Sequence, residues 1–270
     1  MAADDLLIPA GMAAIAAPAL DSAPPGLAEP LGWRRAAVDA ALSLTGVLFA
    51  DDLWELWART PPILRDSPLA GYARSRMRRH LPRRARDRGI VFIHVPKTGG
   101  TSMAQAIYGR GAGHATALFW RAADPKVFIA AESFAMLRDP IDRFVSAYRY
   151  IRNAAEVPLN QRAREFAARM RTADDVISVL EGSSDWAVPK VFRPQHLFVC
   201  DAAGRQMVSR LFLVGEDDEN LRQHLDRYGV AEPQRLNRSR GRRPQLTRRQ
   251  IARLEMLFAK DFSLIDRRVS

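Results

Sequence analysis

The chain has 270 residues, of which 47% are hydrophobic, and a formal net charge of +11 that arginine supplies almost alone, since only four lysines are present. This length suits one domain of ordinary size with extensions. The single cysteine, Cys200, excludes an internal disulfide and fits a reducing cytosol, and no cysteine–histidine cluster has the spacing of a structural zinc site. The basic balance suits an anionic ligand, a nucleic acid or a membrane surface.

The sequence before the first strong motif divides by composition into two parts. Residues 1–30 are rich in alanine and proline and lack the basic start and long apolar core of a signal peptide, which predicts a disordered leader. Residues 31–88 have a helical pattern and precede a predicted domain over residues 89–270. The apolar segment Val38 to Leu48 is cut at Asp51, well short of the roughly 20 residues that span a bilayer, so we expect no membrane anchor and a cytoplasmic location.

A dense run of basic residues closes the extension: Arg74, Arg76, Arg78, Arg79, His80, Arg83, Arg84, Arg86 and Arg88. The simplest interpretation is a solvated helix and linker face. The alternative is a surface that attracts an anionic acceptor or the inner membrane, to which the protein would then be peripheral. Aromatic residues are absent apart from Tyr72, so nucleic acid is not an expected partner.

The first motif predicts an anion-binding loop. An apolar run from Val91 to Pro96 suits a core strand, and Thr101 to Tyr108 suits a helix. Between them, Gly99 and Gly100 let the backbone approach a ligand closely. The helix start adds positive potential and Lys97 adds a full charge. A phosphate or sulfate group is therefore the expected occupant.

The second motif predicts another anion site at the end of a neighbouring strand. Phe134 to Leu137 suits a strand that delivers Arg138 at its carboxyl end, and Asp139 is a good N-cap for the helix that follows. Ser146 lies nearly two turns along that helix, so we expect its hydroxyl on the face that bears Asp139 and Arg143. Arginine and a hydroxyl can clamp one phosphate. The two sites would form the crevice in which open α/β sheets hold nucleotides.

Together the motifs resemble those of sulfotransferases that use 3′-phosphoadenosine 5′-phosphosulfate (PAPS), in particular carbohydrate sulfotransferases of the heparan-sulfate and bacterial type. P-K-T-G-G-T-S, residues 96–102, resembles the 5′-phosphosulfate loop, and R-D-P-I-D-R-F-V-S-A-Y, residues 138–148, resembles the 3′-phosphate motif. The resemblance implies a three-layer α/β/α fold with a central parallel sheet, similar to that of P-loop nucleotide hydrolases. It also implies PAPS as co-substrate, with no metal.

The resemblance further implies which residues bind PAPS: Lys97, Thr98, Gly99, Gly100, Thr101, Ser102, Arg138, Ser146, Arg238 and Ser239. The last two belong to a basic stretch over 236–243 that resembles the loop covering the nucleotide in relatives. Sulfuryl transfer builds negative charge on the leaving group, as phosphoryl transfer does, and Lys97 is expected to stabilise it.

A histidine or glutamate must take the proton of the acceptor hydroxyl. His114 is the first candidate, because it lies between the two motifs, where heparan-type relatives carry a base. His196 is the second candidate and Glu132 the third. The other histidines are expected in non-catalytic positions, which are a satisfied core site for His94 and exposed stretches for His80 and His224.

Weaker features complete the pattern in the second half of the chain. The sequence predicts helices between Tyr150 and Leu180, a further strand over Leu211 to Val214, and a last helix that begins with a capping box of Thr247 and Gln250. The segment Pro194 to Val199 resembles a P-Q-x-x-[FY]-[LV] segment of the family.

The predicted activity is transfer of the sulfuryl group of PAPS to a hydroxyl of a carbohydrate or glycolipid, with a small-molecule alcohol as the second acceptor class. A P-loop kinase would need the order G-x-x-x-x-G-K-[ST], in which lysine follows the glycines, and here lysine precedes them. A nucleotide-binding protein without transferase activity is the remaining alternative.

Overall fold

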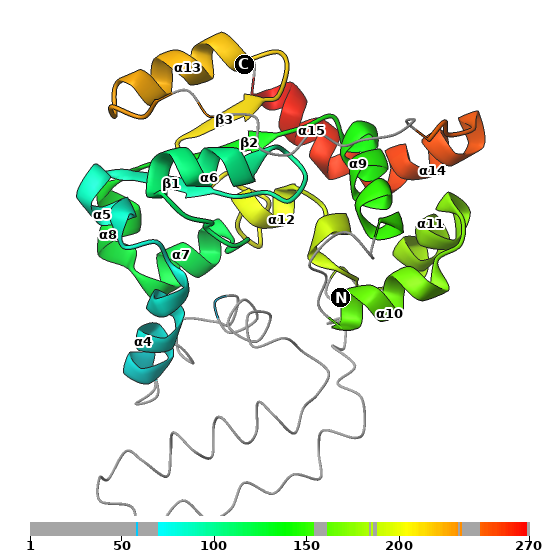
Figure 1. Ribbon diagram of the computed structural model, residues 1–270, viewed down its shortest axis with the longest axis horizontal. Coiled ribbons are helices and arrows are strands. Elements are labelled where there is room, and N and C mark those ends of the chain that lie inside the picture. Colours follow the sequence, from blue (N-terminus) through cyan, green and yellow to red (C-terminus); the bar gives the residue numbers. More distant parts are fainter. Residues whose placement is uncertain are drawn as a thin grey trace, which may run out of the picture. The chain divides into compact units, whose positions relative to one another are not determined.

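The structure is a computed structural model that describes Ala58 and residues 70–153, 161–183, 185, 188–231, 233 and 244–268 (Figure 1). These residues belong to one compact unit that spans Asp51–Ser270. The predicted leader, most of the predicted extension and the basic stretch at 236–243 lie outside the described residues. The domain boundaries predicted from composition stay a prediction.

A parallel sheet with the strand order β1-β2-β3 forms the centre of the described unit. Its strands are β1 (Ile90–Ile93), β2 (Glu132–Leu137) and β3 (Arg210–Leu213). Every residue of β1 is buried, as expected of parallel strands, which read as continuous apolar runs. The predicted α/β fold with a central parallel sheet is confirmed. All three carboxyl ends lie at one edge of the sheet, where loops can meet.

Within the described residues, five helices precede β1 or connect it to β2: α4 (Ala70–His80), α5 (Arg84–Arg88), α6 (Gly100–Tyr108), α7 (Ala117–Ala123) and α8 (Pro125–Ala130). Helix α6 is the helix predicted after the glycine turn. It ends at Gly109, whose left-handed backbone (φ 69°) closes the last turn.

The segment between β2 and β3 forms α9 (Pro140–Arg152), α10 (Gln161–Arg169), α11 (Ala173–Gly182), the short 3₁₀ helix η2 (Lys190–Phe192) and α12 (His196–Val199). Helix α9 begins as the sequence predicts. The carboxylate of Asp139 accepts a hydrogen bond from the N–H of Asp142 at 2.8 Å, and Pro140 occupies the first turn.

The C-terminal part contains α13 (Asp218–Asp226), α14 (Arg248–Leu257) and α15 (Ala259–Arg267). The predicted capping box is present, because Thr247 and Gln250 each accept a hydrogen bond from the backbone N–H of the other. The single predicted last helix is two helices, since the backbone of Phe258 leaves helical geometry (φ −105°, ψ 20°) and starts a new axis.

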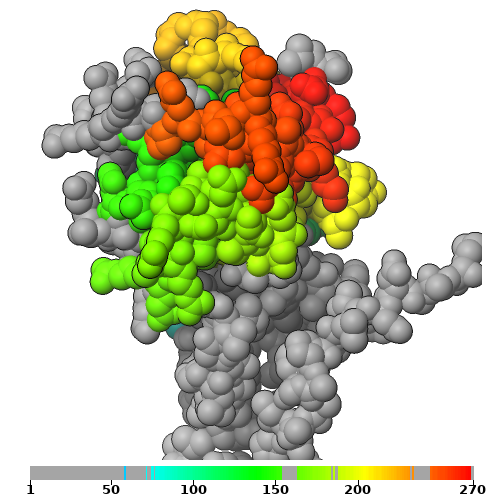
Figure 2. Space-filling view, turned by 90° about the vertical axis from the view of Figure 1, so that its right-hand side faces the viewer, coloured from blue at the N-terminus to red at the C-terminus, as the bar shows by residue number. Residues whose placement is uncertain are grey.

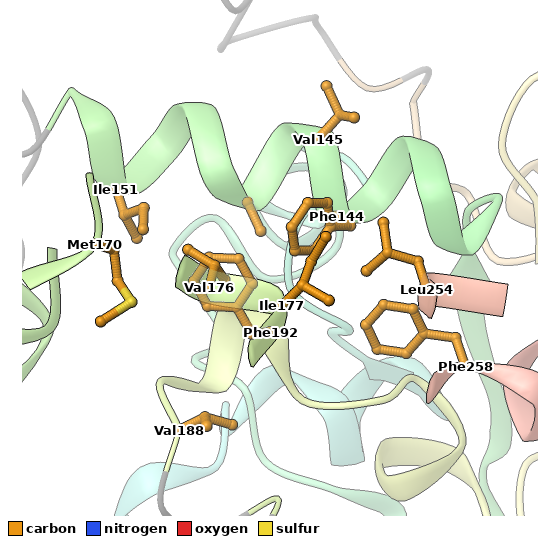
Figure 3. Close-up of a cluster of buried hydrophobic side chains, with 11 residues drawn as sticks. Phe144, Val145, Ile151, Met170, Val176, Ile177, Val188, Phe192, Leu254 and Phe258 are labelled. Carbon is orange, nitrogen blue, oxygen red and sulfur yellow. The ribbon is translucent and has the colours of Figure 1, made fainter. Parts of the chain in front are cut away.

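A hydrophobic cluster joins α9 to the helices around it (Figure 3). Phe144 of α9 packs with Val176 and Ile177 of α11, with Phe192 of η2 and with Leu254 of α14. Figure 2 shows α14 in orange lying against α11 in yellow-green. The packing fixes α9, which carries the second motif, against the rest of the unit.

Helices α4 and α5 pack onto the sheet domain through fully buried Met77 and Ala85. Arg78 Nε donates to the carbonyl of Ala123 at 2.9 Å, and Arg86 Nη2 donates to the carboxylate of Asp124 at 2.8 Å. Part of the basic run is thus bonded to the neighbouring helices α7 and α8.

Candidate active site

The loop after β1 is tightly folded around Lys97. Lys97 has a φ of 69° and is the one non-glycine residue of the described chain with positive φ. A left-handed backbone costs a non-glycine residue about 1–2 kcal/mol, so the surrounding contacts must hold it there. One of them is the buried hydroxyl of Thr98, which donates to the carbonyl of Val95 at 2.9 Å. Gly99 follows with a φ of 86°, and α6 begins next.

Gly100 is required at the first position of α6 for space. A Cβ atom there would overlap the imidazole ring of His94, which is only 7% exposed. The ring therefore packs directly against the start of α6, where free backbone N–H groups point outward. His94 is buried as expected, and its ring forms a hydrogen bond with the backbone of Gly113, while its Nδ1 has no hydrogen-bond partner among the described residues. Burial, and then the nearby His114, lower the pKa of His94 well below its usual value.

Three cationic side chains converge at the carboxyl ends of β1 and β2. Burial, and then repulsion from Arg138 and Arg149, together lower the pKa of Lys97 to about 8. The Lys97 Nζ atom lies 4.2 Å from the centre of the Tyr150 ring. One acid, Asp142, lies close to this group, with its Oδ2 3.8 Å from Nη2 of Arg138. An anion bound here would relieve the mutual repulsion of the cations.

Arg149 and Tyr150 are site residues that the sequence reasoning missed. They lie three and four residues after Ser146, which is half-buried on α9. Residues at these spacings share one face of a helix. The helical position of Ser146 was therefore the signal that could have identified both residues.

The backbone of Arg138 is fixed by two hydrogen bonds to one side chain. The side chain of Gln195, which is fully buried, accepts from the N–H of Arg138 at 3.0 Å and donates to its carbonyl at 2.7 Å. Asp261 of α15, also fully buried, accepts from the backbone N–H groups of Gln195 and His196. The predicted Pro194 to Val199 segment thus positions the arginine of the second motif.

Arg143, which the sequence places on one helix face with Ser146 and Asp139, is buried. It is 1% exposed, whereas Asp139 is exposed. Its guanidinium donates to the carbonyls of Pro96 at 3.5 Å, Val191 at 3.1 Å and Arg193 at 2.6 Å. Burial lowers its pKa to about 10. Arg143 therefore joins the two motifs from inside, because the carbonyl of Pro96 immediately precedes Lys97.

The first candidate base lies beside the loop. His114 is half-buried, its Nδ1 is 3.0 Å from the carbonyl oxygen of His94, and the two imidazole rings are 4.2 Å apart. A carbonyl only accepts hydrogen bonds, so Nδ1 of His114 carries the proton in that contact. In the neutral ring, Nε2 is then the nitrogen with a lone pair, which is the form that a general base requires.

The other two candidate bases have structural partners. Nδ1 of His196 is 2.8 Å from the buried carboxylate of Asp261. Glu132 stands at the amino end of β2, opposite Ile90, and accepts from Nε of Arg210 at 3.0 Å. Glu132 is therefore at the edge of the sheet opposite to the carboxyl ends that deliver Lys97 and Arg138.

Of the remaining histidines, His80 is exposed as expected, and the expectation for His224 is wrong. His224 is 3% exposed and packs between the rings of Phe134 and Phe212. Its polar neighbours in the sequence suggested a solvated stretch, but it lies on the inner face of α13.

The other predicted ligands of PAPS occupy the first turn of α6 or lie outside the described residues. Thr101 is exposed and Ser102 is half-buried at the start of that helix. Arg238 and Ser239 lie outside the described residues. Within the basic run, Arg79, Arg83 and Arg84 are exposed, and a role in binding an acceptor or a membrane stays a prediction.

The described residues offer neither a metal-binding cluster nor a membrane-spanning helix. They contain no group of three or more histidine, cysteine, aspartate or glutamate side chains placed to hold a metal ion. None of their helices is both long and apolar enough to cross a membrane.

The geometry agrees with the comparison to known families. No curated protein and no solved structure gives a significant match to the chain. A model of the sulfotransferase family matches residues 83–264, which include both motifs, the whole sheet and the buried Asp261. Because this match covers more than half of the sequence, the chain belongs to the sulfotransferase family.

Proposed function

We propose that this sulfotransferase uses PAPS as donor and transfers its sulfuryl group to a hydroxyl of a carbohydrate or glycolipid. The observation that carries the proposal is the convergence of Lys97, Arg138 and Arg149 beside the start of α6. Three cations and free backbone N–H groups in one place suit a ligand with two separate anionic groups. PAPS has a 5′-phosphosulfate and a 3′-phosphate. The lone cysteine, Cys200, fits a reducing, cytoplasmic location.

The residues of the site fit this donor. Gly99 places no side chain over the α6 N-terminus, where a 5′-phosphosulfate would bind, and Lys97 can stabilise charge on the departing phosphate oxygen. Arg138 and Ser146 would hold the 3′-phosphate. Nε2 of His114 would take the proton of the acceptor hydroxyl as its oxygen forms a bond to sulfur and the bond from sulfur to the bridging oxygen breaks.

The direct test is transfer of labelled sulfate from PAPS to a panel of polysaccharides, glycolipids and small alcohols. Label in a carbohydrate product supports the whole proposal. If only small alcohols are labelled, the acceptor is a small-molecule alcohol instead of a carbohydrate. The absence of any labelled product, together with tight nucleotide binding, would favour a binding protein instead.

The low pKa of Lys97 predicts pH-dependent binding of adenosine 3′,5′-bisphosphate, the product nucleotide. Below about pH 8 the ammonium is charged in the free protein, and above it the ammonium is increasingly neutral. Because the bound anion favours the charged form, affinity should fall as the pH rises through this value, by up to about tenfold per pH unit. Calorimetry across this pH range measures the fall. Lys97→Arg stays charged and should show no such fall, so an equal pH dependence in this variant would contradict the assignment.

Replacing His114 should separate chemistry from binding. We expect His114→Ala to lower turnover by roughly 10²–10⁴-fold, the usual contribution of a positioned base, and to leave the affinity for adenosine 3′,5′-bisphosphate nearly unchanged. Steady-state kinetics and calorimetry measure the two effects. Full activity of His114→Ala, combined with loss of activity in His196→Ala, would transfer the role to His196.

A further inference from the structure

A cavity of about 650 Å³ lies along β3, two strands away from the loop of Lys97. It is bounded by β3, by α13 and by the C-terminal end of α15, and Figure 1 shows β3 beside both helices. Arg268 ties α15 to the turn before α13, because its guanidinium binds Asp217 at 2.7 Å and Glu216 at 2.9 Å. We call this space the β3–α13 cavity.

His224 lines the β3–α13 cavity with an unmet hydrogen-bonding capacity. The side chain is buried, and neither ring nitrogen has a hydrogen-bond partner among the described residues. Burial lowers the pKa of His224, so the ring is neutral at pH 7 and carries one N–H donor and one lone pair. Buried polar groups in native proteins nearly always have a partner. The ring therefore lacks a hydrogen-bond partner that a molecule bound in the cavity could supply.

The walls of the β3–α13 cavity carry an excess of positive charge. Four arginines line it against a single acid, Asp217. Arg210 is bonded to Glu132 and Arg268 to Asp217, but Arg227 and Arg267 form no hydrogen bond or ion pair with any part of the described chain. The charges of Arg210 and Arg227 also lower the pKa of His224, against the opposing effect of Glu132, which is bonded to Arg210.

We propose that the β3–α13 cavity binds a small organic anion that carries a phosphate or sulfate group, with Arg227 and Arg267 as its counterions and the N–H of His224 as a hydrogen-bond donor. The volume lies within the range of small-molecule sites, and arginine suits phosphate and sulfate oxygens because it donates in a fixed fork. The site is separate from the proposed PAPS site, because it follows the edge strand instead of the carboxyl ends of β1 and β2. It does not depend on the sulfotransferase reaction.

The first test uses the full chain with Lys97→Met, so that the loop of the proposed PAPS site contributes little to anion binding. Calorimetric titration with pyrophosphate and with inorganic sulfate, at low salt, measures the affinity, and the tighter of the two probes identifies the preferred head group. Arg227→Gln combined with Arg267→Gln should raise the Kd about tenfold or more, because charged hydrogen bonds are lost. The control pair Arg121→Gln and Arg169→Gln removes the same charge from exposed positions and should leave the Kd essentially unchanged.

The second test separates binding by His224 from simple packing. Phenylalanine keeps the shape of the ring but has no nitrogen, so His224→Phe should melt at the same or a higher temperature and raise the Kd for the preferred probe about three- to tenfold. The proposal is overturned if neither probe shows saturable binding, if the two arginine pairs weaken binding equally, or if a folded His224→Phe binds as tightly as its parent.

Discussion

Replacing Arg143 by methionine should lower the free energy of unfolding by about 2–4 kcal/mol, because each buried carbonyl that is left without a donor costs about 1–3 kcal/mol. Methionine fills much of the same volume but donates no hydrogen bond. The carbonyls of Val191 and Arg193, and the weaker contact at Pro96, would lose their guanidinium donor inside the protein. Urea unfolding with an unchanged m-value measures the loss of unfolding free energy. This loss is a large part of the 5–15 kcal/mol that stabilises a typical domain.

Two further variants serve as controls for Arg143→Met. Arg143→Lys should recover little, because one ammonium cannot reproduce a planar fork that serves carbonyls from two segments. Arg169→Met removes an exposed arginine of α10 and should change the unfolding free energy by no more than about 0.5 kcal/mol. Wild-type stability of Arg143→Met would contradict the structural role assigned to Arg143.

Gly100→Ala should damage the loop that precedes α6. The added methyl would overlap the His94 ring, and overpacking of this kind costs about 1–3 kcal/mol. Either the ring or the first turn of α6 must shift, which moves the backbone N–H groups away from the anion. Because displacements of about 1 Å can cost 10²-fold in an active site, we expect binding of adenosine 3′,5′-bisphosphate to weaken by about tenfold or more. Calorimetry and thermal unfolding measure the two effects.

The matched control is Gly111→Ala, a glycine close in sequence whose added methyl would meet nothing within 4 Å and whose φ is not in the left-handed region. It should bind the nucleotide like the wild type. The double variant His94→Ala with Gly100→Ala removes the overlap and should recover part of the affinity. If Gly100→Ala binds as tightly as Gly111→Ala, the packing of His94 does not shape the loop.

Local sequence rules predicted the elements that present the site. The apolar run before Pro96 formed β1, Asp139 capped α9, and the pair Thr247 and Gln250 capped α14. Each of these features depends on a few adjacent residues whose hydrogen bonds are made locally. Such patterns therefore sufficed to place Lys97 and Arg138 at the ends of neighbouring strands.

Long-range packing explains what the sequence reasoning missed. The carbonyls that accept hydrogen bonds from Arg143 belong to residues 191–193, almost fifty positions away. No local sequence pattern therefore predicts that Arg143 is buried. His224 was assigned to a solvated stretch, although Leu221, His224 and Leu225 share the buried face of α13 at helical spacing. The repulsion among Lys97, Arg138 and Arg149 likewise depends on two elements brought together by the fold.

The most direct test of the central claim is a calorimetric titration of the protein with adenosine 3′,5′-bisphosphate in the presence of EDTA, with ATP and Mg²⁺ as the comparison. The proposed site predicts saturable binding of the bisphosphate without metal, because Lys97, Arg138 and the α6 N-terminus supply the countercharge and donors. It also predicts that Arg138→Ala weakens this binding by roughly 1.5–3 kcal/mol, the usual contribution of a hydrogen bond to a charged group. Binding that strictly requires Mg²⁺, or an equal preference for ATP, would contradict the account and favour a nucleotide hydrolase.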